Sequence, residues 1–305
     1  MTQRKKTSFK HRLEYGLFAG LISLVKHSPR WALRLEKGLL IFFLKKGSPR
    51  HSQLIAYNLA QAFPDAKPES LAGLKKSIYG HFGLVFMEIV RTFARRDSQA
   101  ILARARVNHI EALEQVLERK QGAIVFSAHF GNWEWLPLIL RDRLKKDIHI
   151  VARPMDNDRI EAKVREFREA MGSQVMYKKG SLRSILKRLE DNEIVCLLID
   201  QNTVEREGVF VDFFGRKAAA ITTVSQLHLK KGVPLVPAFL HYEGEEIVLD
   251  VLPEIDYAAA GDDPAAVTGL TQRLTRLIEE QIRKYPEQWF WFHDRWRTRP
   301  QGEAK

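Results

Sequence analysis

The sequence predicts an α/β fold with a mainly parallel central sheet flanked by helices. The first observation is a set of four short apolar runs, rich in valine and isoleucine, whose composition is typical of strands buried on both faces: AIVFSA (123–128), IHIVA (148–152), EIVCLLID (193–200) and PLVPAFL (234–240). The second is that helical segments separate the runs: 132–145, 158–172, 181–191 and 219–231. This alternation predicts parallel strands joined by right-handed crossovers.

Further elements are expected on either side of this alternating region. Apolar residues at i, i+3 and i+4 spacing predict a helix over 69–95, and a helix that starts near residue 48 is expected to end at Pro64. Residues 241–256 predict a turn and an added, perhaps antiparallel strand. The other expected helices span 108–120 and 263–284.

The positive charge of the chain is concentrated at its N-terminus. The 305 residues carry a formal net charge of +12. Residues 1–50 contain 12 Lys and Arg against 2 Asp and Glu, whereas the other 255 residues contain 37 basic and 35 acidic side chains. Such a basic arm suits a nucleic acid or an anionic membrane surface. The near-neutral body has no recognisable nucleic-acid-binding motif, so we expect no nucleic-acid partner.

Two apolar stretches within this arm favour the membrane surface. They cover 13–25 and 31–44, and both are shorter than the ~20 apolar residues that a spanning helix needs. Positive residues follow each stretch, without the charge asymmetry of a segment that crosses a membrane. We therefore expect 1–50 to form two helices that lie in the interface and 51–305 to form the α/β domain. A helical hairpin packed on the protein's own core is the alternative.

Cys196 is the single cysteine of the chain. Its place in the apolar run IVCLLI predicts a small buried side chain. Because it has no partner for an intramolecular disulfide, and because no convincing cleavage site follows the first apolar stretch, we expect the chain to face the cytoplasm.

Polar and titratable side chains follow each of the four strand-like runs. In a parallel sheet, ligands bind beyond the carboxyl ends of the strands, so these side chains are predicted to share one site. In chain order they are Ser127, His129, Gly131, Asn132 and Glu134; Arg153, Pro154 and Asp156; Asp200, Gln201 and Asn202; and His241.

His129 and Glu134 are the candidate catalytic pair. On one straight helix a five-residue step would turn the side chains roughly 140° apart, so His129 is expected in the loop instead. Gly131 then forms a tight turn and Asn132 caps the following helix. Glu134 falls in the first helical turn, from which it can reach back to His129. A carboxylate on one ring nitrogen makes the other a better base; the alternative is a histidine that only caps the strand end.

Seven segments carry a resemblance to a known family. They are NLAQAFP (58–64), HFGNWEW (129–135), VARPMDN (151–157), LLIDQN (197–202), VDFFGRKAAAITTVSQL (211–227), VPLVPAF (233–239) and HDRWRTRP (293–300). Their kind and order resemble the lipid A biosynthesis acyltransferases of the late lauroyl/myristoyl type, within the His-x-x-x-x-Asp/Glu glycerolipid acyltransferase superfamily. The similarity runs from about residue 10 to residue 300. Phosphatidylinositol mannoside acyltransferases share much of this pattern, so the acceptor stays open.

The resemblance implies a glycerolipid-acyltransferase-like fold and an O-acyltransferase. A fatty acyl group would move from an acyl carrier protein thioester to a hydroxyl of a lipid A precursor, a membrane glycolipid, at the cytoplasmic side of the inner membrane. His129 would remove the hydroxyl proton, and Glu134 would orient His129. Arg153 or backbone N–H groups near Gly131 would stabilise the oxyanion.

This chemistry requires no cofactor, no metal and no covalent acyl-enzyme, and we expect a monomer. One alternative is an acyltransferase of a different glycolipid or phospholipid, of the phosphatidylinositol mannoside type, that uses acyl-CoA. Another is a thioesterase, in which water replaces the acceptor hydroxyl.

Three polar residues of the site have open roles. Arg153 is a candidate to bind a phosphate of the acceptor or of the donor, or else to form an ion pair with Asp156 or Asp200. Asp200 is a candidate to position Arg153 or the acceptor, or else to cap a helix. Ser127 is expected to be structural, because no Gly-x-Ser-x-Gly motif surrounds it.

Other segments also have two interpretations. Phe213 and Phe214 are candidates for the acyl channel or for the core, and Thr222 belongs to the same matching segment. The basic run at 178–188 is a candidate dock for an acidic carrier protein or a solvated helix face. The aromatic residues at 289–296 form either an interfacial belt or packing beneath the sheet.

Overall fold

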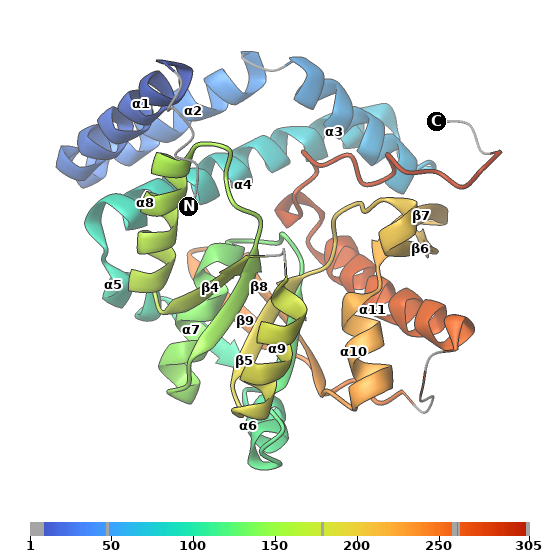
Figure 1. Ribbon diagram of the computed structural model, residues 1–305. Coiled ribbons are helices and arrows are strands. Elements are labelled where there is room, and N and C mark those ends of the chain that lie inside the picture. The colour runs from blue at the N-terminus through green and yellow to red at the C-terminus, as the bar shows by residue number, and fades with distance from the viewer. Residues whose placement is uncertain (1–8, 47–48, 178–179, 258–260, 262, 303–305) are drawn as a thin grey trace.

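A seven-stranded sheet lies at the centre of the computed structural model, which describes residues 9–46, 49–177, 180–257, 261 and 263–302 (Figure 1). In spatial order its strands are β1 (Ala105–Asn108), β9 (Glu246–Val251), β8 (Leu235–Glu243), β2 (Ala123–Ser127), β5 (Ile194–Leu198), β3 (Ile148–Ala152) and β4 (Ser173–Tyr177). Neighbouring strands are parallel, except that β8 and β9 are antiparallel. The mainly parallel sheet, its four predicted strands and the added antiparallel strand are confirmed.

Three parts of the β structure differ from the sequence prediction. β1 and β4 lie at the two edges of the sheet, and their mixed polar sequences lack the long apolar runs of the central strands. A separate antiparallel hairpin consists of β6 (Gly208–Phe213) and β7 (Arg216–Ile221). The helix predicted over 219–231 therefore begins only at Thr223, because residues 216–221 pair with β6 instead of continuing the helix.

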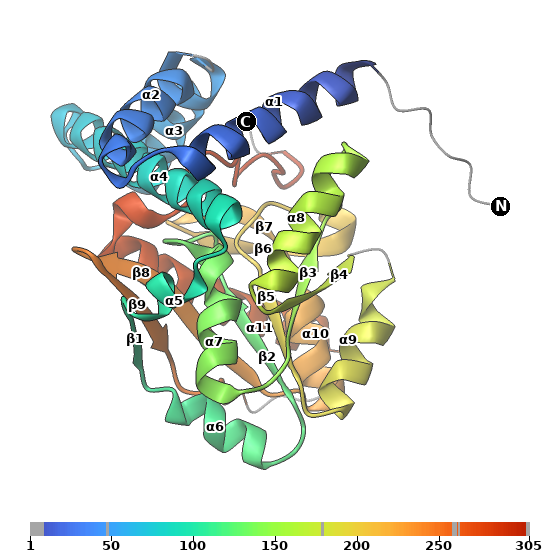
Figure 2. The ribbon, with the colours of Figure 1, turned by 90° about the vertical axis from the view of Figure 1, so that its left-hand side faces the viewer.

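The helices of the α/β domain cover both faces of the sheet (Figures 1 and 2). They are α5 (Ser98–Leu102), α6 (Glu111–Glu118), α7 (Leu136–Leu144), α8 (Asp158–Ala170), α9 (Ser181–Glu190), α10 (Thr223–Lys231) and α11 (Pro264–Lys284), with the short 3-10 helices η2 (Trp133–Trp135), η3 (Glu205–Glu207) and η4 (Pro286–Gln288). Because side chains alternate along a strand, Ile124 and Phe126 pack toward α9, α10 and α11, while Ala123 and Val125 pack toward α6 and α7.

Four N-terminal segments form a helical layer over one end of the sheet (Figure 2). They are α1 (Phe9–His27), α2 (Leu33–Lys46, preceded by η1, Arg30–Ala32), α3 (Pro49–Ala62) and α4 (Pro68–Arg95). The end of α3 just before Pro64 agrees with the sequence prediction. Both α1 and α2 pack on α4: the rings of Phe18 and Phe93 lie 5.4 Å apart, and Glu36 pairs with Arg91 at 2.8 Å. Among the residues that the structure describes, none of the helices combines the length and apolarity needed to cross a bilayer.

Candidate active site

His129 lies in the loop after β2, at the carboxyl edge of the parallel strands. The C-terminal segment holds this loop in place: Phe130 and Trp289 form an isolated antiparallel bridge, and the N–H of Phe290 donates to the carbonyl of His129 at 3.0 Å. The histidine side chain is 20% exposed. The predicted position of His129 beyond the strand end is therefore confirmed, and its ring remains accessible to a ligand.

Asp200 is the carboxylate that holds the His129 ring. It follows β5, the neighbour of β2, and its Oδ1 lies 2.8 Å from Nδ1 of His129. Its Oδ2 accepts hydrogen bonds from the backbone N–H of His129 at 3.0 Å and from the indole N–H of Trp289 at 2.8 Å. Burial opposes ionisation of this carboxyl, but the charge of His129 and these hydrogen bonds outweigh it and lower the pKa of Asp200 to about 2. Asp200 is thus a buried carboxylate that accepts three hydrogen bonds.

This contact determines which ring nitrogen of His129 can act as a base. An ionised carboxylate only accepts hydrogen bonds, so Nδ1 carries the proton in the neutral ring. The lone pair then lies on Nε2, which is directed away from Asp200. The pair has the geometry that orients a general base. The predicted roles of Asp200 as a partner of Arg153 or as a helix cap are corrected by this contact.

Glu134 does not form the predicted pair with His129. Its carboxylate instead forms two hydrogen bonds with Arg168 of α8, to Nη2 at 2.6 Å and to Nε at 3.0 Å. Both side chains are largely buried, 16% and 22% exposed. The physical reason is twofold: Asp200 already occupies Nδ1 of His129, and a guanidinium offers a carboxylate two parallel donors. Sequence analysis did not identify Arg168.

Gly131 forms the predicted tight turn and Asn132 lies at the predicted N-cap position, but neither provides the predicted hydrogen bond. Gly131 has φ +54°, and a Cβ there would lie 2.1 Å from the carbonyl oxygen of Leu240, so the tight turn requires glycine. Its N–H donates to the carbonyl of Gln288 at 2.9 Å, which removes this group as an oxyanion donor. Asn132 lies at the N-cap position of η2 without a side-chain cap bond, and its amide faces the hydroxyl of Tyr242 at 3.3 Å.

Arg153 follows β3 and is exposed. Within the described part of the chain, it forms no ion pair with Asp156 or Asp200 and no hydrogen bond to His129. The expected ion pairs are therefore wrong for this structure. Its role as a phosphate or oxyanion ligand stays a prediction.

The candidate channel residues lie in or next to the core. The Phe213 ring packs 5.6 Å from that of Trp289, and the Phe214 ring packs 5.4 Å from that of Phe63. Both phenylalanines are at most 5% exposed. Thr222 is buried at the N-cap position of α10, and its carbonyl accepts from the N–H of Gln226 at 2.8 Å. An acyl-channel role for these three residues stays a prediction.

The three tryptophans of the C-terminal aromatic segment are core residues. Trp289, Trp291 and Trp296 are each at most 2% exposed. The alternative of an interfacial belt is therefore wrong for these three tryptophans, and packing within the fold is confirmed.

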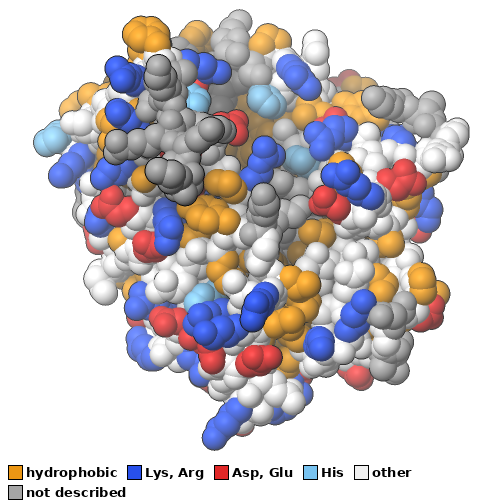
Figure 3. All heavy atoms as spheres, viewed as in Figure 1, with side chains coloured by type: hydrophobic (Ala, Val, Ile, Leu, Met, Phe, Trp, Pro, Cys, Tyr) orange, Lys and Arg blue, Asp and Glu red, His pale blue; other side chains and the backbone are white. Residues whose placement is uncertain are grey.

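Partly exposed apolar rings lie beside His129. The rings of Trp133 and Phe290 lie 5.1 and 6.2 Å from the imidazole, and Phe86 of α4 packs 6.4 Å from Phe290. On the face that Figure 3 views, hydrophobic side chains are visible at the surface, with Lys and Arg side chains among them. The His129 ring therefore lies beside partly exposed apolar side chains.

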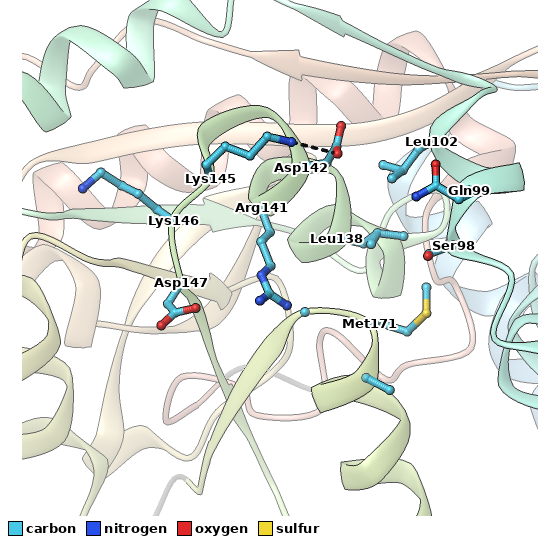
Figure 4. Close-up of a pocket in the computed structure, with 12 residues that line it drawn as sticks. Ser98, Gln99, Leu102, Leu138, Arg141, Asp142, Lys145, Lys146, Asp147 and Met171 are labelled. Atoms are coloured by element: carbon cyan, nitrogen blue, oxygen red, sulfur yellow. Dashed lines mark hydrogen bonds and ion pairs between the residues drawn. The ribbon is translucent and has the colours of Figure 1, made fainter.

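A cavity of about 440 Å³ is separate from this site (Figure 4). Arg141, Lys146 and Asp147 line it, and Lys145 pairs with Asp142 at 3.1 Å. These residues lie at the C-terminal end of α7, which runs back from the carboxyl edge of the sheet. The cavity therefore lies toward the opposite edge and adds nothing to the chemistry at His129.

The structure combines a mainly parallel α/β fold with a histidine–carboxylate pair at the strand ends, beside partly exposed apolar rings. The chain belongs to the bacterial lipid A biosynthesis acyltransferase family, whose model matches residues 2–298.

Individual relatives are similar over most of the chain. Phosphatidylinositol mannoside acyltransferase of Mycobacterium tuberculosis (strain ATCC 25618 / H37Rv) is 26% identical over 264 residues, 84% of this chain and 79% of the relative. Two relatives come from Escherichia coli (strain K12). Lipid A biosynthesis lauroyltransferase is 25% identical over 83% of this chain and 81% of the relative. Lipid A biosynthesis palmitoleoyltransferase is 23% identical over 84% of this chain and 81% of the relative.

Proposed function

We propose that this protein transfers a fatty acyl group from a thioester to a hydroxyl of a lipid A precursor at the cytoplasmic face of the inner membrane, and that acyl carrier protein holds the thioester. The observation that carries the proposal is the fixed His129 ring: Asp200 holds Nδ1 at 2.8 Å, so Nε2 is the basic nitrogen. Membership of the lipid A acyltransferase family supports the acyl-transfer chemistry.

The reaction proceeds in two steps at the open side of His129. The acceptor oxygen attacks the thioester carbonyl carbon as Nε2 takes the hydroxyl proton, and the π electrons of the carbonyl move onto its oxygen. The tetrahedral intermediate then collapses: the carbonyl re-forms, the C–S bond breaks, and the sulfur leaves with its electron pair and receives the proton from Nε2. Asp200 stabilises the imidazolium between the two steps. The products are an ester and a thiol.

Glu134 fixes a largely buried cation, Arg168. It holds Nε and Nη2 of Arg168, and Nη1 is not part of that pair. The pKa of Arg168 is raised: burial alone would lower it, but the carboxylate of Glu134 outweighs burial. Arg168 is therefore a fixed cation.

The N-terminal helices present apolar side chains to the outside. Exposed large hydrophobic residues recur every three or four positions, which places them on one side of each helix: Phe9, Leu13, Leu17, Leu21 and Leu24 on α1, and Trp31, Leu35, Leu39 and Phe42 on η1 and α2. We call this set the apolar stripe. Lys10, Arg12 and Lys26 of α1 are also exposed. Exposed apolar side chains with adjacent cations suit an anionic bilayer surface, so we propose that the stripe docks there.

Replacing Leu13, Leu17 and Leu24 together with glutamine tests the apolar stripe. Burial of one leucine side chain is worth roughly 1.5–3 kcal/mol, so the triple variant is expected to bind vesicles of phosphatidylglycerol and phosphatidylethanolamine at least about a hundredfold more weakly. Cosedimentation measures the partitioning. Leu182→Gln on α9 is the matched control, because Leu182 is 53% exposed but outside the stripe. Unchanged binding of the triple variant would show that the anchor lies elsewhere.

Basic side chains on α9 bear on the choice of acyl donor. Arg183 and Lys187 are exposed on α9 and remain candidates for docking an acidic carrier protein. The basic residues at 178 and 179 lie outside the described residues.

An assay of the purified full-length protein in detergent tests the proposed function. Radiolabelled acyl carrier protein thioester and acyl-CoA are each offered with a lipid A precursor or with a phosphatidylinositol mannoside, and lipid products are separated by thin-layer chromatography. We expect an ester of the lipid A precursor with the carrier-protein donor. Hydrolysis of the thioester without a lipid product would favour a thioesterase. Product only with the mannoside and acyl-CoA would overturn both the acceptor and the donor.

A further inference from the structure

Gln201 is the residue that contacts the basic nitrogen of His129. It follows Asp200 in the turn after β5, and its side-chain nitrogen lies 3.3 Å from Nε2 of His129. The side chain is only partly buried, so it lies between the imidazole and the open side of the site. The mechanism above assigns no role to this residue.

The direction of this hydrogen bond follows from the state of the ring. Asp200 fixes the proton on Nδ1, at 2.8 Å, so Nε2 offers a lone pair. A side-chain amide nitrogen only donates. Gln201 therefore donates one N–H to the nitrogen at which the acceptor hydroxyl must arrive, and its amide lies beside the place where bonds form and break.

The turn that carries Gln201 is held on its C-terminal side. The backbone N–H of Asn202 donates to Nε2 of His293 at 2.8 Å, and the side chains of Asn202 and Thr298 lie 3.0 Å apart. Thr298 also donates its hydroxyl to the carbonyl of Thr203 at 2.9 Å. Burial lowers the pKa of His293 to about 4, which keeps its ring neutral and able to accept. Asp200 is fixed on the other side, so contacts hold the backbone of the turn on both sides of Gln201.

We propose that the side-chain amide of Gln201 stabilises the oxyanion of the tetrahedral intermediate, an inference that rests on the proposed acyl transfer. Nε2 has one lone pair, so the attacking hydroxyl displaces the Gln201 amide there before it gives up its proton, and Nε2 then becomes an N–H that no longer accepts. The displaced amide N–H is free when the thioester carbonyl oxygen, one bond from the attacked carbon, gains negative charge. A donor held in advance near developing charge is the arrangement that stabilises oxyanions.

Two of the donors considered from the sequence, Arg153 and the N–H of Gly131 itself, are less suited to this role. The N–H of Gly131 is bonded to Gln288, and Arg153 is exposed on a different loop. Within the described chain, Gln201 is the side-chain amide that reaches Nε2 of His129.

Gln201→Met tests the proposal, because methionine keeps the length of the side chain and removes its N–H donors. Loss of one oxyanion donor costs roughly 10²–10³-fold in kcat, so we expect that fall, with KM for both substrates changed less than about threefold and an unchanged Tm. Gln201→Glu, which also cannot donate when ionised, is expected to fall at least as far. The matched control is Gln226→Met on the exposed side of α10, expected to retain wild-type kcat.

A binding measurement separates this role from a structural one. A long-chain alkylphosphonate monoester mimics the tetrahedral intermediate, whereas a thioether analogue of the donor mimics the ground state. Gln201→Met is expected to weaken binding of the phosphonate by roughly 10²–10³-fold and binding of the thioether by less than about threefold. Equal weakening of both, or wild-type kcat, would overturn the role of Gln201 while leaving acyl transfer intact. A wild-type protein that transfers no acyl group would overturn both.

Discussion

Replacement of His129 by alanine is expected to lower the rate of acyl transfer by roughly 10²–10⁴-fold, the usual contribution of a general base. The variant keeps the loop, because the backbone N–H of residue 129 still donates to Asp200 and its carbonyl still accepts from Phe290. It loses only the ring whose Nε2 takes the hydroxyl proton. Initial rates with saturating donor and acceptor measure kcat, and thermal unfolding checks that the fold is intact.

His109→Asn is the matched control for this experiment. His109 follows β1, which is antiparallel to the central parallel strands, so it lies at the opposite edge of the sheet. It is 73% exposed with φ 59°, a conformation that asparagine tolerates. We expect wild-type activity from the control. Acyl transfer that persists at the wild-type rate in His129→Ala would mean that another group is the base.

The fold could be predicted from the sequence in segments where a single hydrophobic pattern dominates. The central strands β2, β5 and β8 are buried on both faces, and a continuous apolar run in the sequence predicts such a strand. The hairpin residues Ala219 and Ala220 have strong helix propensity and were predicted as helix, yet pairing with β6 determines their conformation. The polar edge strands lack a comparable signal. Local secondary-structure propensity therefore gave the wrong prediction where contacts between residues distant in sequence determine the structure.

The same limit explains the errors at the site. The position of His129 follows from the end of β2 and was predictable. Its partner was not: Asp200 lies 71 residues away in sequence, and Glu134 meets Arg168 across 34 residues. The sequence placed Asp200 at the correct edge of the sheet, but only the order β2–β5 makes it the neighbour of His129. A motif spacing shows which residues gather, whereas strand order determines which of them touch.

The carboxylate that matters most to His129 can be tested by comparing Asp200→Asn with Glu134→Gln. An asparagine amide at residue 200 can donate to Nδ1, which favours the tautomer with its proton on Nε2 and removes the basic lone pair. A wrong tautomer costs up to about 10⁴-fold in a serine-protease triad, and we expect a fall of roughly 10²–10⁴-fold in kcat here. Glu134→Gln leaves His129 and Asp200 untouched, so we expect kcat to fall less than about tenfold.

Glu134→Gln is expected to affect the fold more than the chemistry. Arg168 would lose its charged partner in a largely buried place, at a cost of about 1–3 kcal/mol of unfolding free energy. Urea unfolding measures this loss. A fall in kcat as large as that of Asp200→Asn would instead restore Glu134 to a direct role at His129.

Acid unfolding gives Asp200→Asn a second signature that is independent of catalysis. The folded state lowers the pKa of Asp200 from 3.8 to about 2, through the charge and hydrogen bonds of His129 and despite burial. Between these values the unfolded chain binds the proton more readily, so the stability that this carboxylate contributes is complete above pH 3.8 and is lost as the pH falls through about 2. The contribution is on the order of 2 kcal/mol. Urea unfolding at pH 5 and pH 2.5 is therefore expected to show a larger acid-induced loss in the wild type than in Asp200→Asn. Equal losses in the two proteins would mean that Asp200 is not the ionised partner of His129.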